Sequence, residues 1–249
     1  MIIRSPKELL ERFHLLVSGD VFVGVVPFKH LKKTFFIDLL ERGIRCIPSP
    51  LSQVLNGSKT SQALVLKEFM LPDTRVVTRR ADLIEFSRHY NRKGIGPVVT
   101  KEDRMHCGYG IRKWDSMELL YNVVGMTESV YPFVLQPYMD GFIDVRVIIV
   151  EDLIDAYVRK NPDNFRQNLA AGGKGTPYLL GSEEEEFCRA VMKRGRFPYG
   201  HIDLQIMEDG TRYLSEVALN GGMAGSRLDR KEVDRKKQAV LENLIMEGW

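Results

Sequence analysis

One turn signal in the second half of the chain fixes the geometry of a hairpin. Asp209-Gly210 is typical of a two-residue β-turn, because both central residues of that turn need positive φ angles. With this pair at the tip of a hairpin over residues 199–219, Asp203 lies directly opposite Glu216. The alternation of side chains along a strand then puts both acids on the same face.

Two facing carboxylates call for a cation between them. Like charges directly opposite each other destabilise a sheet. Magnesium fits this position, because it binds one or two carboxylates together with phosphate oxygens and water. The alternative is a solvated hairpin face on which two acids meet by chance. We therefore predict a Mg²⁺ site, or a Mn²⁺ site, at Asp203 and Glu216.

A second signal combines a lysine with two glycines. Lys101 ends a predicted strand over residues 97–101, and Gly108 and Gly110 lead into the next strand. A lysine can contact phosphate oxygens as a point charge, and glycines let backbone N–H groups approach the same oxygens. A Gly-any-Gly sequence alone is equally typical of a tight turn. Followed by the acid hairpin, it favours a triphosphate site.

The predicted elements alternate between helix and strand, which indicates an α+β chain. A short N-terminal βαβ-like segment comes first, followed by two α+β lobes that meet near residue 135. Helices are expected at residues 5–16, 29–42, 59–70 and 81–90, after Asp115, from Ser182 and at 229–246, and strands at 21–26, 44–47, 74–78, 97–101, 109–113, 133–136, 142–150, 153–160 and in the hairpin. We therefore divide the chain into residues 1–57, 58–135 and 136–249.

Composition excludes several classes of protein. Lys and Arg exceed Asp and Glu by only 36 to 33, and the basic stretch 227–237 also contains acids, so no nucleic-acid partner is expected. The longest apolar stretch, at residues 147–150, is far shorter than the roughly 20 residues of a membrane span. The N-terminus lacks the features of a signal peptide. We expect a cytoplasmic protein without a membrane partner.

The three cysteines predict no thiol chemistry. Cys46, Cys107 and Cys188 are odd in number and widely spaced, which indicates neither a disulfide framework nor a metal-binding pair. His106 precedes Cys107 directly, but neighbouring side chains on an extended chain point in opposite directions. A catalytic thiol–imidazole pair is therefore not expected.

The motifs occur in an order that resembles the ATP-grasp superfamily, and most closely its branch containing the ribosomal-protein glutamate ligase (RimK type). Lys101, six further residues and Gly108-Tyr109-Gly110 are similar to the flexible phosphate loop of that branch. The remaining similarities are Lys59 ahead of Leu71-Pro72, the hinge Val134-Leu135-Gln136-Pro137-Tyr138, the strand Asp144-Val145-Arg146, the stretch Phe165-Arg166-Gln167-Asn168 before Gly172-Gly173, and the acids Asp203 and Glu216. The resemblance covers residues 58–225.

This resemblance implies an ATP-grasp fold, in which two lobes grip ATP, and an ATP-dependent carboxylate–amine ligase that forms an amide bond through an acyl phosphate. Its partners would be small-molecule or peptide carboxylates and amines, and a homodimer is compatible with it. The implied roles are phosphate binding for Lys59, Lys101, Gly108 and Gly110, adenine binding for Gln136 and Tyr138, magnesium binding for Asp203, Glu216 and Asn220, and stabilisation of the acyl phosphate for Arg146 and Arg166.

Two positions depart from the pattern of the family. Pro137 replaces the acid of the adenine hinge, so we expect backbone groups of Tyr138 to contact adenine. Ala218 replaces the metal-binding asparagine, and Asn220 can substitute only if the chain bends after residue 219. Two alternatives therefore remain open: a kinase on the same scaffold that phosphorylates a hydroxyl group, and a nucleotide-binding module without catalysis.

Overall fold

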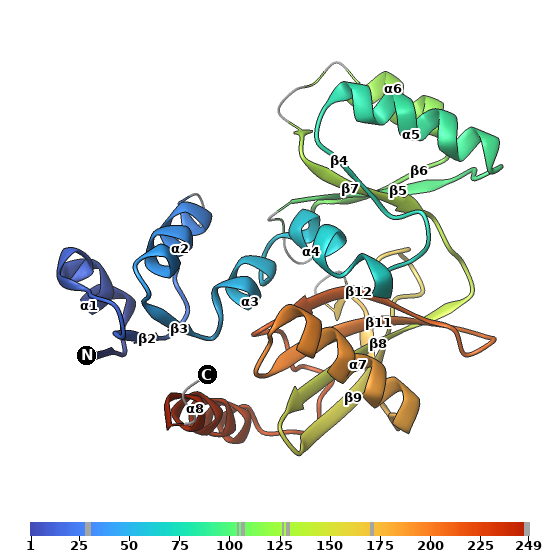
Figure 1. Ribbon diagram of the computed structural model, residues 1–249. Helices are drawn as coiled ribbons and strands as arrows, with labels where there is room; N and C mark the ends of the chain where they lie inside the picture. Colours follow the sequence, from blue (N-terminus) through green and yellow to red (C-terminus); the bar gives the residue numbers. More distant parts are fainter. Residues whose placement is uncertain are drawn as a thin grey trace.

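Three β-sheets organise the chain (Figure 1). The computed structural model describes residues 1–27, 31–103, 105, 108–125, 127, 130–169 and 172–246. Within these residues, no helix is both long enough and apolar enough to cross a membrane.

The N-terminal unit contains a small parallel sheet with the strand order β1-β2-β3. Its elements are β1 (Ile2–Ile3), α1 (Pro6–Glu11), β2 (Val21–Val23), α2 (Lys32–Glu41), β3 (Arg45–Ile47) and α3 (Pro50–Leu55), with a 3₁₀ turn at Phe13–Leu15. The expected βαβ-like segment is present. Helix α3 replaces the turn-rich stretch that we expected, because Ser49 caps it by accepting a hydrogen bond from Ser52 N at 3.1 Å.

The next sheet has four antiparallel strands in the order β4-β7-β5-β6. Its elements are α4 (Lys59–Val65), a 3₁₀ turn (Lys67–Phe69), β4 (Arg75–Val77), α5 (Arg80–Arg92), β5 (Val98–Glu102), β6 (Ile111–Trp114), α6 (Met117–Val124) and β7 (Phe133–Pro137). Helices α5 and α6 cover its outer face (Figure 1). Ser116 caps α6, so the expected cap at Asp115 is wrong by one residue. Because β7 belongs entirely to this sheet, we propose that the lobes divide after Pro137.

The third sheet has five antiparallel strands in the order β10-β9-β8-β11-β12. Its elements are β8 (Phe142–Val150), β9 (Leu153–Lys160), β10 (Lys174–Tyr178), α7 (Ser182–Gly195), β11 (Gly200–Met207) and β12 (Arg212–Ala218). Strands β8 and β9 have the predicted bounds. Strand β10 was not predicted, because it contains Gly175 and Pro177, which are both disfavoured in strands.

The hairpin of β11 and β12 has the predicted pairing of the two acids, but its loop and its strand pairing differ from the prediction. Its loop contains three residues, 208–210, because Met207 N donates to Thr211 O at 2.8 Å. The two-residue turn was therefore wrong. A β-bulge then shifts the pairing by one residue between Asp203 and Leu204. The two shifts cancel, and Asp203 lies opposite Glu216 as predicted.

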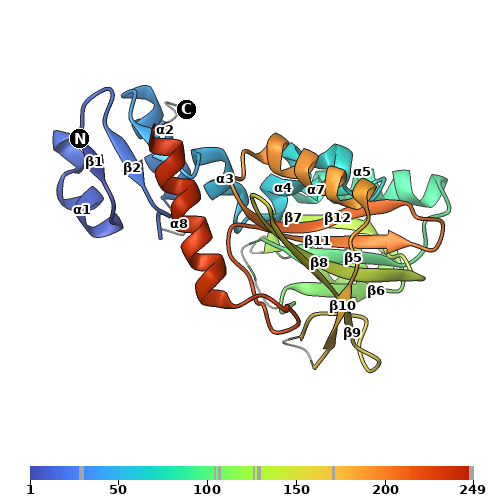
Figure 2. The ribbon, with the colours of Figure 1, turned by 90° about the horizontal axis from the view of Figure 1, so that it is seen from below.

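The last helix, α8 (Arg230–Met246), lies beside both the N-terminal sheet and the five-stranded sheet (Figure 2). Arg4 Nη2 lies 2.9 Å from Glu242 Oε2, and Arg45 Nη2 donates to Leu244 O at 3.4 Å. One apolar core contains side chains from β2, β3, β8, β11 and α8. The N-terminal unit is therefore packed onto the second lobe through α8.

Candidate functional site

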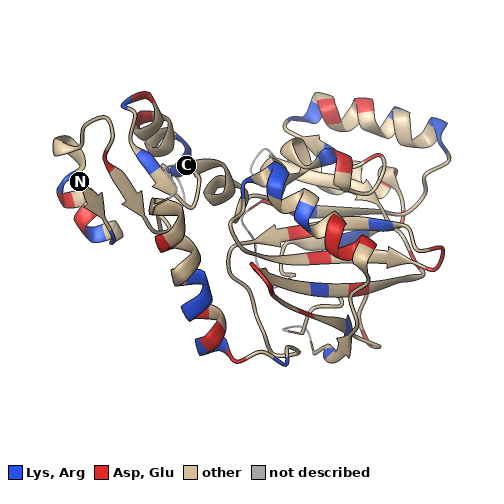
Figure 3. Cartoon of the chain, turned by 60° about the horizontal axis from the view of Figure 1, so that its bottom comes forward, with Lys and Arg blue, Asp and Glu red and all other residues tan. Residues whose placement is uncertain are grey.

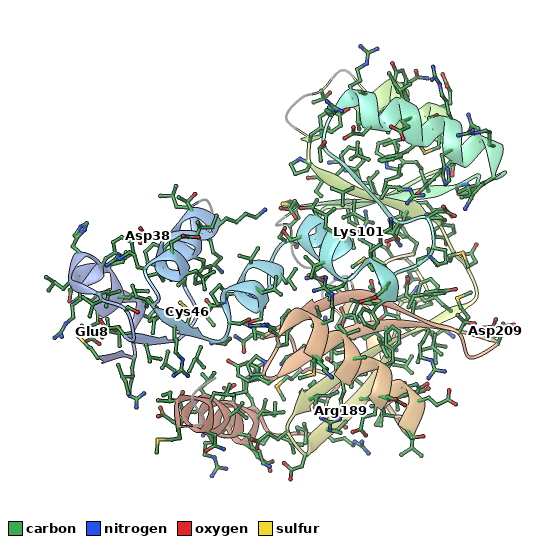
Figure 4. The ribbon with its side chains drawn as sticks, viewed as in Figure 1. Glu8, Asp38, Cys46, Lys101, Arg189 and Asp209 are labelled. Carbon is green, nitrogen blue, oxygen red and sulfur yellow. The ribbon has the colours of Figure 1, made fainter. Side chains whose placement is uncertain are left out.

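A cleft opens between the four-stranded and five-stranded sheets. Lys101 lies between these sheets in Figure 4. The cavity within the cleft has a volume of about 80 Å³, and the cleft is open to solvent. Its lining includes four of the predicted site residues, Lys101, Gln136, Tyr138 and Arg166, together with Asp144, Gln205 and Ser215 from the second lobe.

Lys101 crosses the cleft from the end of β5 to the hairpin. Its side chain is buried, and Nζ donates to the carbonyl oxygen of Ser215 at 3.4 Å and to its hydroxyl oxygen at 3.3 Å. Ser215 is the extra residue of the β-bulge, so the bulge provides the acceptors for this lysine. Burial lowers the pKa of Lys101 to about 8, while the nearby Glu216 carboxylate raises it.

Lys59 approaches the same carboxylate from the first turn of α4. Its ammonium group donates to the backbone carbonyl of Met105 and lies 3.9 Å from Glu216 Oε1. Asp103 holds this turn in place, because its Oδ1 accepts hydrogen bonds from Thr60 N at 3.1 Å and Thr60 Oγ1 at 3.0 Å. The two predicted phosphate-binding lysines therefore converge on Glu216.

Asp203 is held by two arginines on neighbouring strands. Arg146 donates from Nε to Asp203 Oδ1 at 2.7 Å and from Nη2 to Oδ2 at 2.8 Å. Arg159 Nη1 lies 3.0 Å from Asp203 Oδ2, and Arg159 Nε donates to Asp144 Oδ1 at 2.5 Å. Burial raises the pKa of Asp203, but the two guanidinium groups outweigh it and hold the pKa below its usual range. Asp203 is thus an ionised carboxylate.

Arg159 is the one residue of this network that the sequence analysis missed. Its neighbour Lys160, in contrast, is exposed at the end of β9. Alternation along β9 was the available signal: Arg159 lies on the same face as Tyr157, which pairs with Arg146 across the sheet. The side chain of Arg159 is only 5% exposed.

The predicted glycines lie where side chains do not fit. A Cβ atom on Gly108 would lie 3.1 Å from Asn168 Oδ1, and one on Gly110 would lie 2.6 Å from the Cβ of Met105. Arg166 Nε donates to Gly108 O at 3.1 Å. In this arrangement Arg166 therefore holds the glycine loop, while Arg146 binds Asp203.

The predicted adenine end of the cleft agrees only partly with expectation. Gln136 and Tyr138 both line it. However, Tyr138 N donates to Pro97 O at 2.9 Å, so this N–H group is already used within the sheet. Lys113 Nζ lies 3.6 Å from the centroid of the Tyr138 ring. An adenine contact by Gln136 or Tyr138 stays a prediction, and the Tyr138 N–H is not free to make it here.

Asn220 does not join the acid pair. Its Oδ1 accepts a hydrogen bond from Lys237 Nζ of α8 at 2.9 Å. Lys237 also donates to Leu219 O at 2.9 Å and contacts His201 Nε2 at 3.2 Å. Burial, and then the charge of Lys237, lower the pKa of His201 to about 3, so His201 is neutral.

The residues present fit a magnesium ion held chiefly by phosphate. Asp203 and Glu216 offer carboxylate oxygens across one rung of the hairpin. Among the residues that the structure describes, no three His, Cys, Asp or Glu side chains form a metal-binding group. Two carboxylates completed by phosphate oxygens and water are the coordination that Mg²⁺ prefers.

The described cysteines show no sign of nucleophilic function. Cys46 and Cys188 are buried, and burial raises the pKa of each thiol to about 12. Cys107 and His106 lie outside the described residues.

Comparisons with known proteins show the family of the chain. A family model of the RimK-like ATP-grasp domain matches residues 55–240. The chain is 26% identical over 197 residues to the coenzyme gamma-F420-2:alpha-L-glutamate ligase of Methanococcus maripaludis, which covers 76% of this chain and 67% of the relative.

Solved structures show the same fold. The D-alanine–D-alanine ligase of Bacillus anthracis matches with a TM-score of 0.66 and 17% identity, over 98% of this chain and 86% of that ligase. The ATP-grasp ligase PsnB, in complex with a variant of its minimal precursor, magnesium and ADP, matches with a TM-score of 0.57 and 18% identity, over 85% of this chain and 67% of PsnB.

Proposed function

Because the chain belongs to the RimK-like ATP-grasp domain family, we propose that it is an ATP-dependent carboxylate–amine ligase acting through an acyl phosphate. One observation carries this proposal: two lysines from the first lobe converge on Glu216, directly opposite Asp203. Such a site places two lysines from the first lobe and two carboxylates, suited to a metal ion, from the second lobe around a triphosphate. The similar proteins named above are themselves ligases.

The proposed chemistry has two steps. The substrate carboxylate forms a bond to the terminal phosphorus of ATP while the bond to the leaving ADP breaks. The amine nitrogen then bonds to the acyl carbon, phosphate leaves, and the amine loses a proton to solvent. Bound magnesium would neutralise the phosphate oxygens. The protein contributes mainly orientation and charge, as is usual in phosphoryl transfer.

The side chains divide this work. Lys59 and Lys101 bind phosphate oxygens, and Asp203 and Glu216 hold the metal ion. Arg146 stabilises the acyl phosphate, since its side chain remains 20% exposed while Arg159 is nearly buried behind it. Arg166 and the backbone at Gly108 and Gly110 close the phosphate end of the cleft. The substrates are small-molecule or peptide carboxylates and amines.

A trapping experiment tests the proposal. Candidate acids are screened for ADP release with ATP and Mg²⁺, and hydroxylamine is added in place of the amine. An acyl phosphate yields a hydroxamate. Arg146→Ala should suppress the hydroxamate more than it weakens ATP binding, while Arg189→Ala, on the surface of α7, serves as the matched control. Phosphorylation of an alcohol without hydroxamate would establish the kinase instead. ATP binding without turnover of any substrate would establish the non-catalytic module.

A further inference from the structure

The rung beside the acid pair offers no carboxylate. His201 pairs with Ala218 in the hairpin, two residues along each strand from Asp203 and Glu216 and on the same face. The methyl group of Ala218 cannot bind a metal ion. On this face, strand β12 therefore presents Glu216 as a metal ligand, and the next position on the same face, Ala218, contributes none.

A lysine ammonium group lies at this second rung instead. Lys237 Nζ contacts His201 Nε2, Leu219 O and Asn220 Oδ1 at 3.2, 2.9 and 2.9 Å. Three N–H donors thus meet three acceptors, and the residue is only 6% exposed. Because the ammonium group has no acceptor site, Nε2 of His201 must be unprotonated to receive its hydrogen bond.

These three acceptors are the kinds of atom that also bind metal ions. An imidazole nitrogen, a backbone carbonyl and a side-chain amide oxygen are all common metal ligands. In this chain they already surround the ammonium group of Lys237, a residue of α8. Figure 3 shows further basic residues along the same helix. A second divalent ion at this rung would have no carboxylate ligand and would be repelled by the ammonium group of Lys237.

We propose that the site holds a single divalent ion, between Asp203 and Glu216, and that the side-chain nitrogen of Lys237 occupies the next rung on the same face. This inference rests on the proposed nucleotide site. It also implies that Asn220 accepts a hydrogen bond from Lys237 and does not bind the metal ion. Lys237 is accordingly a positioning residue, which holds the chain after β12 in place without contacting the reacting groups.

Metal counting tests this directly. Free Mn²⁺ is followed by electron paramagnetic resonance while it is titrated into the full-length protein with a non-hydrolysable ATP analogue. The expected result is one nucleotide-dependent Mn²⁺ per chain. Two ions per chain would overturn the single-ion inference and leave the ligase proposal intact. No nucleotide-dependent ion would overturn both.

Two variants locate the ion. Glu216→Gln should weaken Mn²⁺ binding at least about tenfold, because it removes a carboxylate ligand. Asn220→Ala should leave the Mn²⁺ affinity within about twofold, because Asn220 contacts Lys237. A tenfold loss in Asn220→Ala would place Asn220 on the ion and refute the assignment. Circular dichroism of both variants checks that the fold is retained.

Discussion

The charge of Lys101 should make ATP binding sensitive to pH. Burial lowers the pKa of this lysine to about 8 in the nucleotide-free protein. Its ammonium group is surrounded by Glu216, Lys59, Asp144 and Asp203, which come from four different elements. Phosphate oxygens beside it favour the charged form, so the nucleotide-bound protein holds this proton more tightly. Affinity must then fall as the pH rises through 8.

The size of the effect follows from the fraction of protein that carries the proton. With a pKa of about 8, roughly nine tenths of the free protein has a charged Lys101 at pH 7 and roughly one tenth at pH 9. Protonating the lysine on binding therefore costs about tenfold in affinity at pH 9, which is about 1.4 kcal/mol. Phosphate groups, with a pKa of about 6, are already ionised across this range.

Calorimetry in two buffers of different ionisation enthalpy measures both the affinity for magnesium–ATP and the number of protons taken up on binding. We expect the dissociation constant of magnesium–ATP to rise about tenfold from pH 7 to pH 9, with proton uptake at pH 9. Lys101→Arg should abolish both effects, because arginine stays charged. Lys237, whose pKa burial also lowers to about 8, remains in that variant. A tenfold fall that persists in Lys101→Arg would refute the assignment to Lys101.

Four further substitutions test the site and its support. Glu216→Gln should abolish the thermal stabilisation by magnesium–ATP but not the fold, and an unchanged shift in melting temperature would remove Glu216 from the site. Arg159→Met should lower the free energy of unfolding by about 3–5 kcal/mol, because it removes the ion-pair partner of the buried Asp144 carboxylate. In a denaturant titration of both variants, Arg4→Ala should lower the free energy of unfolding by at most about 1 kcal/mol. Equal losses in Arg159→Met and Arg4→Ala would contradict this reasoning. Gly225→Ala would bring a Cβ within 2.4 Å of Tyr157 Cδ2 and should destabilise the protein, whereas a neutral result would show that the loop yields.

The sequence predicted most elements because local signals agreed with the periodicity. The bounds of β8 and β9 were correct, since β8 begins with alternating residues and ends in a continuous apolar stretch at residues 147–150, and a turn at residues 151–152 separates it from β9. Helix α3 was missed although Ser49-Pro50 repeats the start signal of Ser5-Pro6.

The site was predictable where one strand pair determined it and unpredictable where separate elements meet. The facing positions of Asp203 and Glu216 needed only the hairpin, although the loop and the bulge each shifted the pairing by one residue. The contact of Asn220 with Lys237 depends on how α8 docks, and no local pattern determines that. Arg159 was missed because the register of β8 and β9 was not predicted, although this strand pair places Arg159 directly opposite Asp144.

The docking of α8 connects the N-terminal unit to the hairpin of β11 and β12, which carries Asp203 and Glu216. One end of this helix is tied to the N-terminal sheet through Glu242 and the carbonyl of Leu244. One turn or more earlier, Lys237 donates to the residue that follows β12. A helix moves nearly as a rigid rod, and a slide of one residue is about 1.5 Å. Such a slide is enough to break a hydrogen bond of 2.9 Å. Tilting the N-terminal unit would thus loosen the end of the strand that carries Glu216.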